Sequence, residues 1–238
     1  ARVLGLGETM RFMECCEGEK RMADKLELFA KKHIDGHAPG IRGKEVQAYR
    51  LAGVENDHEC STAEEVLDKL RAGLHIYVRE GSGAKNLETL IKTMLDAGVC
   101  LDRCAFCTDD KHVEEIRKEG HISTCIRKAI ALGVPVAKAY KMGSYQAAEF
   151  YGLKNYGAIG AGYRADIVFL DDLEQVRPLD VMKDGRILTE EDYAKDYSVP
   201  VPDELLHTVH VGEVTKEKIR LSCDGKTDVI QMNPHQIV

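Results

Sequence analysis

The chain has 238 residues, of which 44% are hydrophobic and 31% are charged, and this composition is typical of a globular protein with a buried core. Its net charge of −7 excludes the strongly basic surface on which nucleic-acid binding depends. No stretch approaches the roughly 18 apolar residues of a membrane span, and no secretory signal is recognisable, so we expect a cytoplasmic location.

Short apolar runs alternate with amphipathic stretches over the first 150 residues. Strands that run into polar loops are predicted at 3–8, 33–40, 54–59, 74–83 and 103–110. Helices are predicted at 23–32, 43–53, 61–73, 86–98, 121–133 and 144–153. Ser61 and Glu64 form the expected capping box of the third helix. The repeated order of strand, polar loop and helix predicts a parallel α/β fold.

The sequence changes in character after Gly152. Glycine turns and a β-rich run at 157–172 precede a predicted hairpin around Asp184 and Gly185, which indicates a small β domain. A proline-containing stretch at 198–204 reads as a linker, and two further strands are predicted at 218–223 and 227–232.

Polar side chains stand at the end of every strand predicted in the first 150 residues. They are Glu8, His37, His58, Glu59, Arg79, Glu80, Asp109 and Asp110. In (β/α) barrels these ends share one rim, where catalytic residues collect. Each residue alone has an ordinary explanation, such as a solvated carboxylate or a helix N-cap. Because carboxylates and imidazoles bind Mn, Fe and Zn, their recurrence on five strands favours a metal site that activates water for hydrolysis.

Three of the eight cysteines raise a different hypothesis. Cys100, Cys104 and Cys107 have a C-x3-C-x2-C spacing like that of the cluster loop in radical S-adenosylmethionine enzymes. That function is disfavoured because the array comes late in the chain and Cys107 lies inside a predicted strand. We expect reduced thiols at all eight positions, with Cys107 as a small apolar residue of the strand.

The polar motifs also carry a resemblance to a known family. In chain order, GLGE, DGHAPG, DHE, REGS, FCTDD and GAIGAGYRADIVFLDD resemble the bacterial adenine deaminases of the amidohydrolase superfamily. The resemblance implies a distorted (β/α)8 TIM-like barrel, of which this chain supplies strands four to eight. It further implies three segments: the C-terminal part of the barrel at 1–150, a small β domain at 151–198, and the start of a further C-terminal domain at 199–238.

The same resemblance implies a role for each matched residue. Glu8 would bridge two metals, His37 and His58 would bind them, and Asp109 would bind metal and carry the proton. Glu59 and Glu80 would hold the purine, and Asp110 and His112 would shape the loop around Asp109. The implied cofactor is a binuclear divalent metal, most plausibly Mn or Fe(II), with Zn as an alternative.

The implied reaction is hydrolytic deamination of adenine to hypoxanthine and ammonia by metal-activated water, a step of purine salvage. The expected partners are this small-molecule substrate and further copies of the chain in a homo-oligomer. The family's His-x-His pair is found nowhere in the chain, so we expect the first barrel strands to come from the rest of the polypeptide or from a partner. Two alternatives stay open: another cyclic-amide or amidine hydrolase of the superfamily, such as a hydantoinase or dihydroorotase relative, or an inactive fragment or subunit.

Overall fold

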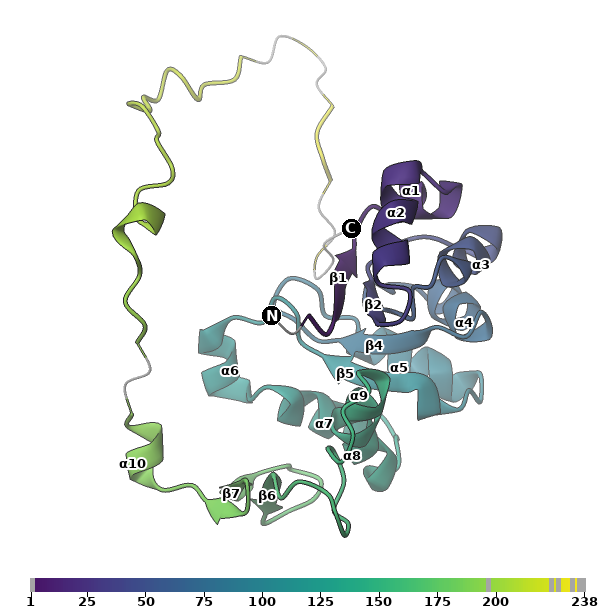
Figure 1. The fold of residues 1–238 in the computed structure, drawn as a ribbon, viewed down its shortest axis with the longest axis vertical. Helices are drawn as coiled ribbons and strands as arrows, with labels where there is room; N and C mark the ends of the chain where they lie inside the picture. Colours follow the sequence, from purple (N-terminus) through teal and green to yellow (C-terminus); the bar gives the residue numbers. More distant parts are fainter. Residues whose placement is uncertain (1–2, 196–197, 223–224, 226–227, 232–233, 235–238) are drawn as a thin grey trace. The chain divides into compact units, whose positions relative to one another are not determined.

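The computed structural model describes residues 3–195, 198–222, 225, 228–231 and 234. Figure 1 shows the elements in chain order. The chain divides into two compact units: the first comprises residues 1–187 and 233–238, and the second comprises residues 188–232. Each unit is described by itself.

Five parallel strands form the centre of the first unit. They are β1 (Gly5–Thr9), β2 (His33–Gly36), β3 (Asn56–Asp57), β4 (His75–Arg79) and β5 (Cys104–Cys107). β1 pairs with β2, and β3, β4 and β5 pair in that order. The Glu55 N–H donates to the Ile34 carbonyl at 3.1 Å, which places β3 beside β2. All five strands predicted in this region are therefore confirmed, and they lie in chain order.

Besides the short 3₁₀ helix η1 (Leu101–Arg103), nine α-helices lie in the described part of the first unit. They are α1 (Phe12–Glu17), α2 (Lys20–Leu28), α3 (Gly43–Leu51), α4 (Ala63–Arg71), α5 (Leu87–Asp96), α6 (Val113–Glu119), α7 (Ile122–Ala131), α8 (Val136–Gly143) and α9 (Tyr145–Phe150). The six predicted helices are confirmed, with ends shifted by a few residues. The helices α1, α6 and α8 were not predicted. The case of α6 is clear, because none of its residues is buried and it has no apolar stripe to recognise.

The core lies between the helices and the strands. In α5, Leu87, Leu90, Ile91 and Met94 recur at helical spacing, and all four are completely buried. They belong to the same apolar cluster as residues of β4 and β5. Burial of each such side chain contributes about 1.5–3 kcal/mol, so this stripe fixes α5 against the strands.

The capping box of α4 differs from the prediction by one residue. Thr62, not Ser61, is the N-cap, and its partner is Glu65 in place of Glu64. The Glu65 carboxylate accepts from the Thr62 N–H at 2.9 Å, while the Thr62 hydroxyl accepts from the Glu65 N–H at 3.3 Å. The reason is tertiary: Glu65 is buried and faces a buried lysine of the same helix, whereas Glu64 is exposed.

A separate antiparallel sheet ends the first unit. It consists of β6 (Ile167–Leu170), β7 (Pro178–Lys183) and β8 (Arg186–Ile187). Asp184 and Gly185 join β7 to β8 with φ angles of 51° and 80°, as a two-residue type I′ turn requires. The predicted hairpin is confirmed.

The second unit contains α10 (Glu190–Tyr193) and the short 3₁₀ helix η2 (Asp203–Leu205). The strands predicted at 218–223 and 227–232 are wrong for the residues that the structure describes, since 218–222 and 228–231 form none. Residues 223, 227 and 232 lie outside the described residues. An apolar alternation makes a strand only where another strand pairs with it, and the described residues offer these segments none. None of the described helices is long and apolar enough to span a membrane.

Candidate metal centre

The parallel strands bring the predicted polar residues to one edge. Glu8 stands at the penultimate position of β1, His37 follows β2 directly, and His58 follows β3 directly. Asp109 lies two residues beyond the end of β5. Because parallel strands present their carboxyl ends together, residues far apart in the sequence meet here.

Glu8, His37 and His58 form a compact group. The Nδ1 atom of His37 lies 3.0 Å from Oε2 of Glu8 and 3.4 Å from Nε2 of His58. One donor atom from each of the three residues lies within 4.8 Å of the other two. One carboxylate and two imidazoles at this spacing fit a divalent metal of the Mn, Fe or Zn type.

Glu59 adds a buried carboxylate beside the two histidines of this group. Its Oε1 atom lies 3.4 Å from Nε2 of His58 and 3.8 Å from Nδ1 of His37, and the side chain is only 3% exposed. Burial raises the pKa of Glu59, while Arg79 and the two histidines oppose that rise. Glu59 is thus a buried acid in direct contact with both imidazoles.

Arg79 links the group to Asp109. This buried residue ends β4, and its guanidinium forms ion pairs with Glu59 and Asp109, and with Asp110 at 3.2 Å. Asp109 has a left-handed φ of 44°, a conformation that aspartate tolerates better than most residues. From the sequence, Arg79 is recognisable as a polar strand end, but its role is not. The sequence feature that could have indicated a role is the charged residue at the end of the largely apolar strand HIYVR.

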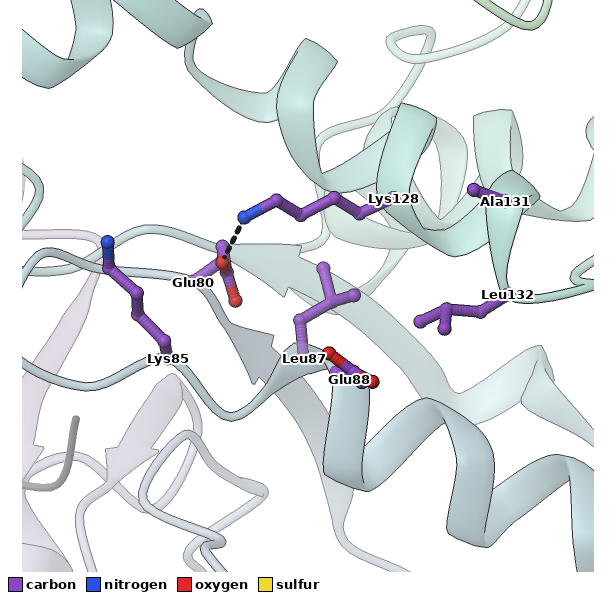
Figure 2. Close-up of a pocket in the computed structure, with 7 residues that line it drawn as sticks. All are labelled: Glu80, Lys85, Leu87, Glu88, Lys128, Ala131 and Leu132. Carbon is purple, nitrogen blue, oxygen red and sulfur yellow. Dashed lines mark hydrogen bonds and ion pairs between the residues drawn. The ribbon is translucent and has the colours of Figure 1, made fainter. Parts of the chain in front are cut away.

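Glu80 lies apart from this group. It is buried and its Oε1 atom accepts from Lys128 at 2.6 Å, an interaction drawn in Figure 2. Both residues line a pocket of about 400 Å³ between the start of α5 and α7, together with Lys85, Leu87, Glu88, Ala131 and Leu132. Within the described part of the chain, no ion pair or hydrogen bond joins Glu80 to the three residues of the proposed metal group.

Among the residues that the structure describes, the cysteines form no candidate metal or cluster site. All seven described cysteines are free thiols, and Cys223 lies outside the described residues. Cys104 and Cys107 lie within β5, whereas Cys100 is exposed before it. Burial raises the pKa of Cys104 to about 12 and the pKa of Cys107 well above its usual value, which disfavours the thiolates that iron–sulfur ligation needs.

Comparison with curated sequences finds strong similarity to adenine deaminases. The chain is 40% identical over 237 residues to the adenine deaminase of Desulfitobacterium hafniense, covering 99% of this chain and 41% of that protein. It is 42% identical over 232 residues to the adenine deaminase of Clostridium acetobutylicum, covering 96% of this chain and 40% of that protein. The chain therefore spans about two fifths of the length of these relatives, and the resemblance seen in its motifs extends over nearly all of it.

Solved structures agree at the level of the fold. A β-aspartyl dipeptidase from Fervidobacterium islandicum matches with a TM-score of 0.58 at 17% identity, over 83% of this chain and 61% of that one. An amidohydrolase from Thermotoga maritima matches with a TM-score of 0.52 at 16% identity, over 76% of this chain and 54% of that one. Identities this low show a common fold alone.

The model of the amidohydrolase family matches residues 18–188, which is most of the chain. That match and the candidate metal group together support a divalent metal at the strand ends. The chain belongs to the amidohydrolase family.

Proposed function

We propose that this chain is part of a metal-dependent hydrolase that converts adenine and water into hypoxanthine and ammonia. The observation that carries the proposal is the identity of about 40% to adenine deaminases over nearly the whole chain. The group formed by Glu8, His37 and His58 supports it, because hydrolysis of an aromatic amine needs an activated water.

The proposal extends to the architecture. We infer that β1 to β5 correspond to strands four to eight of a (β/α)8 barrel, and that 151–198 and 199–238 belong to a small β domain and a further C-terminal domain. The remaining barrel strands would then come from elsewhere in the polypeptide or from a partner subunit. The chain order of the five parallel strands supports this assignment.

Each residue has a role in the proposed site. Glu8, His37, His58 and Asp109 would hold a binuclear centre of Mn or Fe(II), and the first three already form one compact group. Such ions supply Lewis acidity and lower the pKa of bound water toward about 7. Glu59 and Glu80 would contact the purine ring, although Glu80 must first exchange or share its contact with Lys128.

Asp109 would carry the proton in this reaction. Its carboxylate would take a proton from the attacking water and deliver it to the exocyclic amine at C6, which leaves as ammonia. The ion pair with Arg79 orients Asp109, and about a third of the Asp109 side chain is exposed, so it is accessible to a substrate. Both features suit a proton carrier, because its carboxylate must be held in one orientation and still be reached by the substrate.

The test is turnover by the purified full polypeptide that contains this chain, together with any partner subunit, supplied with Mn²⁺ or Fe²⁺. We expect hypoxanthine and ammonia from adenine in equal amounts, and no product from hydantoin or dihydroorotate. Turnover of these cyclic amides without turnover of adenine would replace the substrate assignment. Failure of the full polypeptide to turn over any of them would overturn the proposed function and leave an inactive fragment or subunit as the alternative.

The role of Asp109 can be tested separately. Asp109→Asn removes the proton acceptor, so we expect the rate to fall by about 10²–10⁴-fold, the usual contribution of general acid–base catalysis. Asp96→Asn, an exposed aspartate at the end of α5, is the matched control and should retain full turnover. Full turnover by Asp109→Asn would end the assignment.

A further inference from the structure

We propose that Tyr49 and Lys69 are positioning residues that hold the three strand ends of the metal group at the spacing the metal needs. Both residues belong to helices that pack outside the strands, and neither belongs to the group itself. The inference rests on the proposed metal site, and it concerns how the chain sets the relative places of Glu8, His37 and His58.

Tyr49 joins the end of β1 to the end of β2. It comes from α3 and is completely buried. Its hydroxyl donates to the carbonyl of Thr9, the residue after Glu8, at 3.0 Å. The same hydroxyl accepts from the backbone N–H of His37 at 3.0 Å. Because one oxygen makes both bonds, the backbone beside Glu8 and the backbone of His37 cannot move apart without breaking one of them.

Lys69 joins the end of β2 to the end of β3. It comes from α4 and is also completely buried. Its ammonium donates to the carbonyl of Ala38, the residue after His37, at 2.6 Å. It also donates to Oδ2 of Asp57, the residue before His58, at 3.0 Å. The Oδ1 atom of Asp57 accepts from the Ala38 N–H at 2.7 Å, so the ends of β2 and β3 are also joined by a direct hydrogen bond.

These contacts form one continuous chain across the site. Tyr49 connects the backbone next to Glu8 with that of His37, and Lys69 connects the backbone next to His37 with the side chain of Asp57, the residue before His58. Buried polar groups are expensive to leave unpaired, so the two side chains resist alternative loop positions. Residues that orient metal ligands typically change metal affinity by about 10–100-fold when they are removed.

The decisive variant is Tyr49→Phe, which deletes one oxygen and keeps the ring. We expect the Kd for Mn²⁺, measured by titration calorimetry on the protein shown to be folded by circular dichroism, to rise by about 10–100-fold. Tyr140→Phe is the matched control, because the Tyr140 hydroxyl also donates to a backbone carbonyl, that of Leu173, at 2.7 Å. Its Mn²⁺ affinity should stay within about twofold of the wild type.

Thermal melting of the metal-free proteins separates positioning from general stability. A purely structural role would lower the melting temperature of Tyr49→Phe and leave its Kd for Mn²⁺ unchanged, and this result would overturn the inference. Lys69→Met should weaken Mn²⁺ binding at least tenfold as well. If Lys69→Met does not fold, the Tyr49→Phe titration alone decides.

Glu8→Gln distinguishes failure of this inference from failure of the proposed function. If Glu8→Gln abolishes Mn²⁺ binding and Tyr49→Phe leaves it unchanged, the metal site stands and the positioning role falls. If Glu8→Gln also binds Mn²⁺ like the wild type, the metal site itself is wrong and both proposals fall.

Discussion

The guanidinium of Arg79 forms ion pairs with acidic side chains from two other segments of the chain. Glu59 comes from the loop after β3, whereas Asp109 and Asp110 come from the loop after β5. A buried charge is tolerated only where opposite charges and hydrogen bonds compensate its loss of hydration. Removal of the arginine therefore leaves a buried carboxylate, that of Glu59, without its main partner.

Arg79→Met should accordingly lower the free energy of unfolding by about 3–5 kcal/mol, the usual cost of breaking a buried ion pair. Arg71→Met is the matched control, because Arg71 is 71% exposed and pairs with Asp68 at 3.3 Å. The control should lose less than about 1 kcal/mol. Urea denaturation of both variants checks the difference, and equal losses would contradict the burial argument.

Residues differ in whether their role can be recognised from the sequence alone. Glu8, His37 and His58 could be proposed because each stands at the end of a predicted strand, and such a position can be recognised without a structure. Tyr49 and Lys69 could not, since each lies on a helix where an aromatic ring or a lysine stem usually means packing or solvent. Their partners come from separate loops, and only tertiary structure brings those loops together.

At the scale of elements, α4 shows how a buried acid sets a helix start. Glu65 accepts from the N–H groups of Ser61 and Thr62 and from that of Gly40, in the loop after β2. One carboxylate thus caps a helix and anchors a neighbouring loop. Glu64, its sequence neighbour, is exposed.

This arrangement predicts different outcomes for two isosteric changes. Glu65→Gln should cost about 1.5–3 kcal/mol of unfolding free energy, because it weakens hydrogen bonds to a charged acceptor. Glu64→Gln should change it by less than about 0.5 kcal/mol, as expected for a surface position. Chemical denaturation of the pair measures both values, and a larger loss at Glu64 would restore the capping box first predicted from the sequence.

His75 begins β4 and packs against α9. Its ring centroid lies 3.7 Å from that of Phe150, and its Nδ1 atom is buried without a hydrogen-bond partner among the described residues. Burial lowers the pKa of His75 to about 4, and the nearby Arg103 adds to the effect. The neutral ring is therefore the form that the folded chain accommodates.

A pH dependence follows from this shift. Between pH 6.5 and about 4 the unfolded chain binds a proton at His75 that the folded chain does not, so stability falls as the pH falls through this window. We expect the unfolding free energy of the wild type, relative to His75→Gln, to drop by about 1–3 kcal/mol from pH 7 to pH 4. Denaturation curves at several pH values give this difference, and a constant difference would refute the assignment.

The elements that could be predicted are those with an internal pattern. The stripe of α5 is visible in the sequence because its four apolar residues recur at helical spacing. The helix α6 has no buried residue and no such stripe, so its sequence does not predict a helix. The strand predicted at 218–223 is wrong for its described residues 218–222 and shows the opposite error: a local pattern is present, but the described structure has no strand to pair with it.

At the scale of the molecule, the two units differ in how well their backbone is protected. Within the described residues 198–222, the only regular element is η2, and almost every side chain is exposed. Trypsin should therefore cleave first after Lys216, Lys218 or Arg220. A protease binds its substrate as an extended chain, so it cleaves first where the backbone is not held by the hydrogen bonds of a helix or sheet. Mass spectrometry of a brief digest identifies these sites, and earlier cleavage within α4 or α5 would contradict the expectation.

The parallel strands also concentrate charge of one sign. At their carboxyl ends, Glu8, Glu59, Asp109 and Asp110 stand in one linked group with a single guanidinium, in a chain whose net charge is −7. A surface of this kind raises the local concentration of divalent cations and steers them toward the imidazoles before any bond forms. Salt shortens the reach of that field to about 8 Å at physiological ionic strength. The rate of metal uptake, as distinct from its affinity, should therefore fall as ionic strength rises.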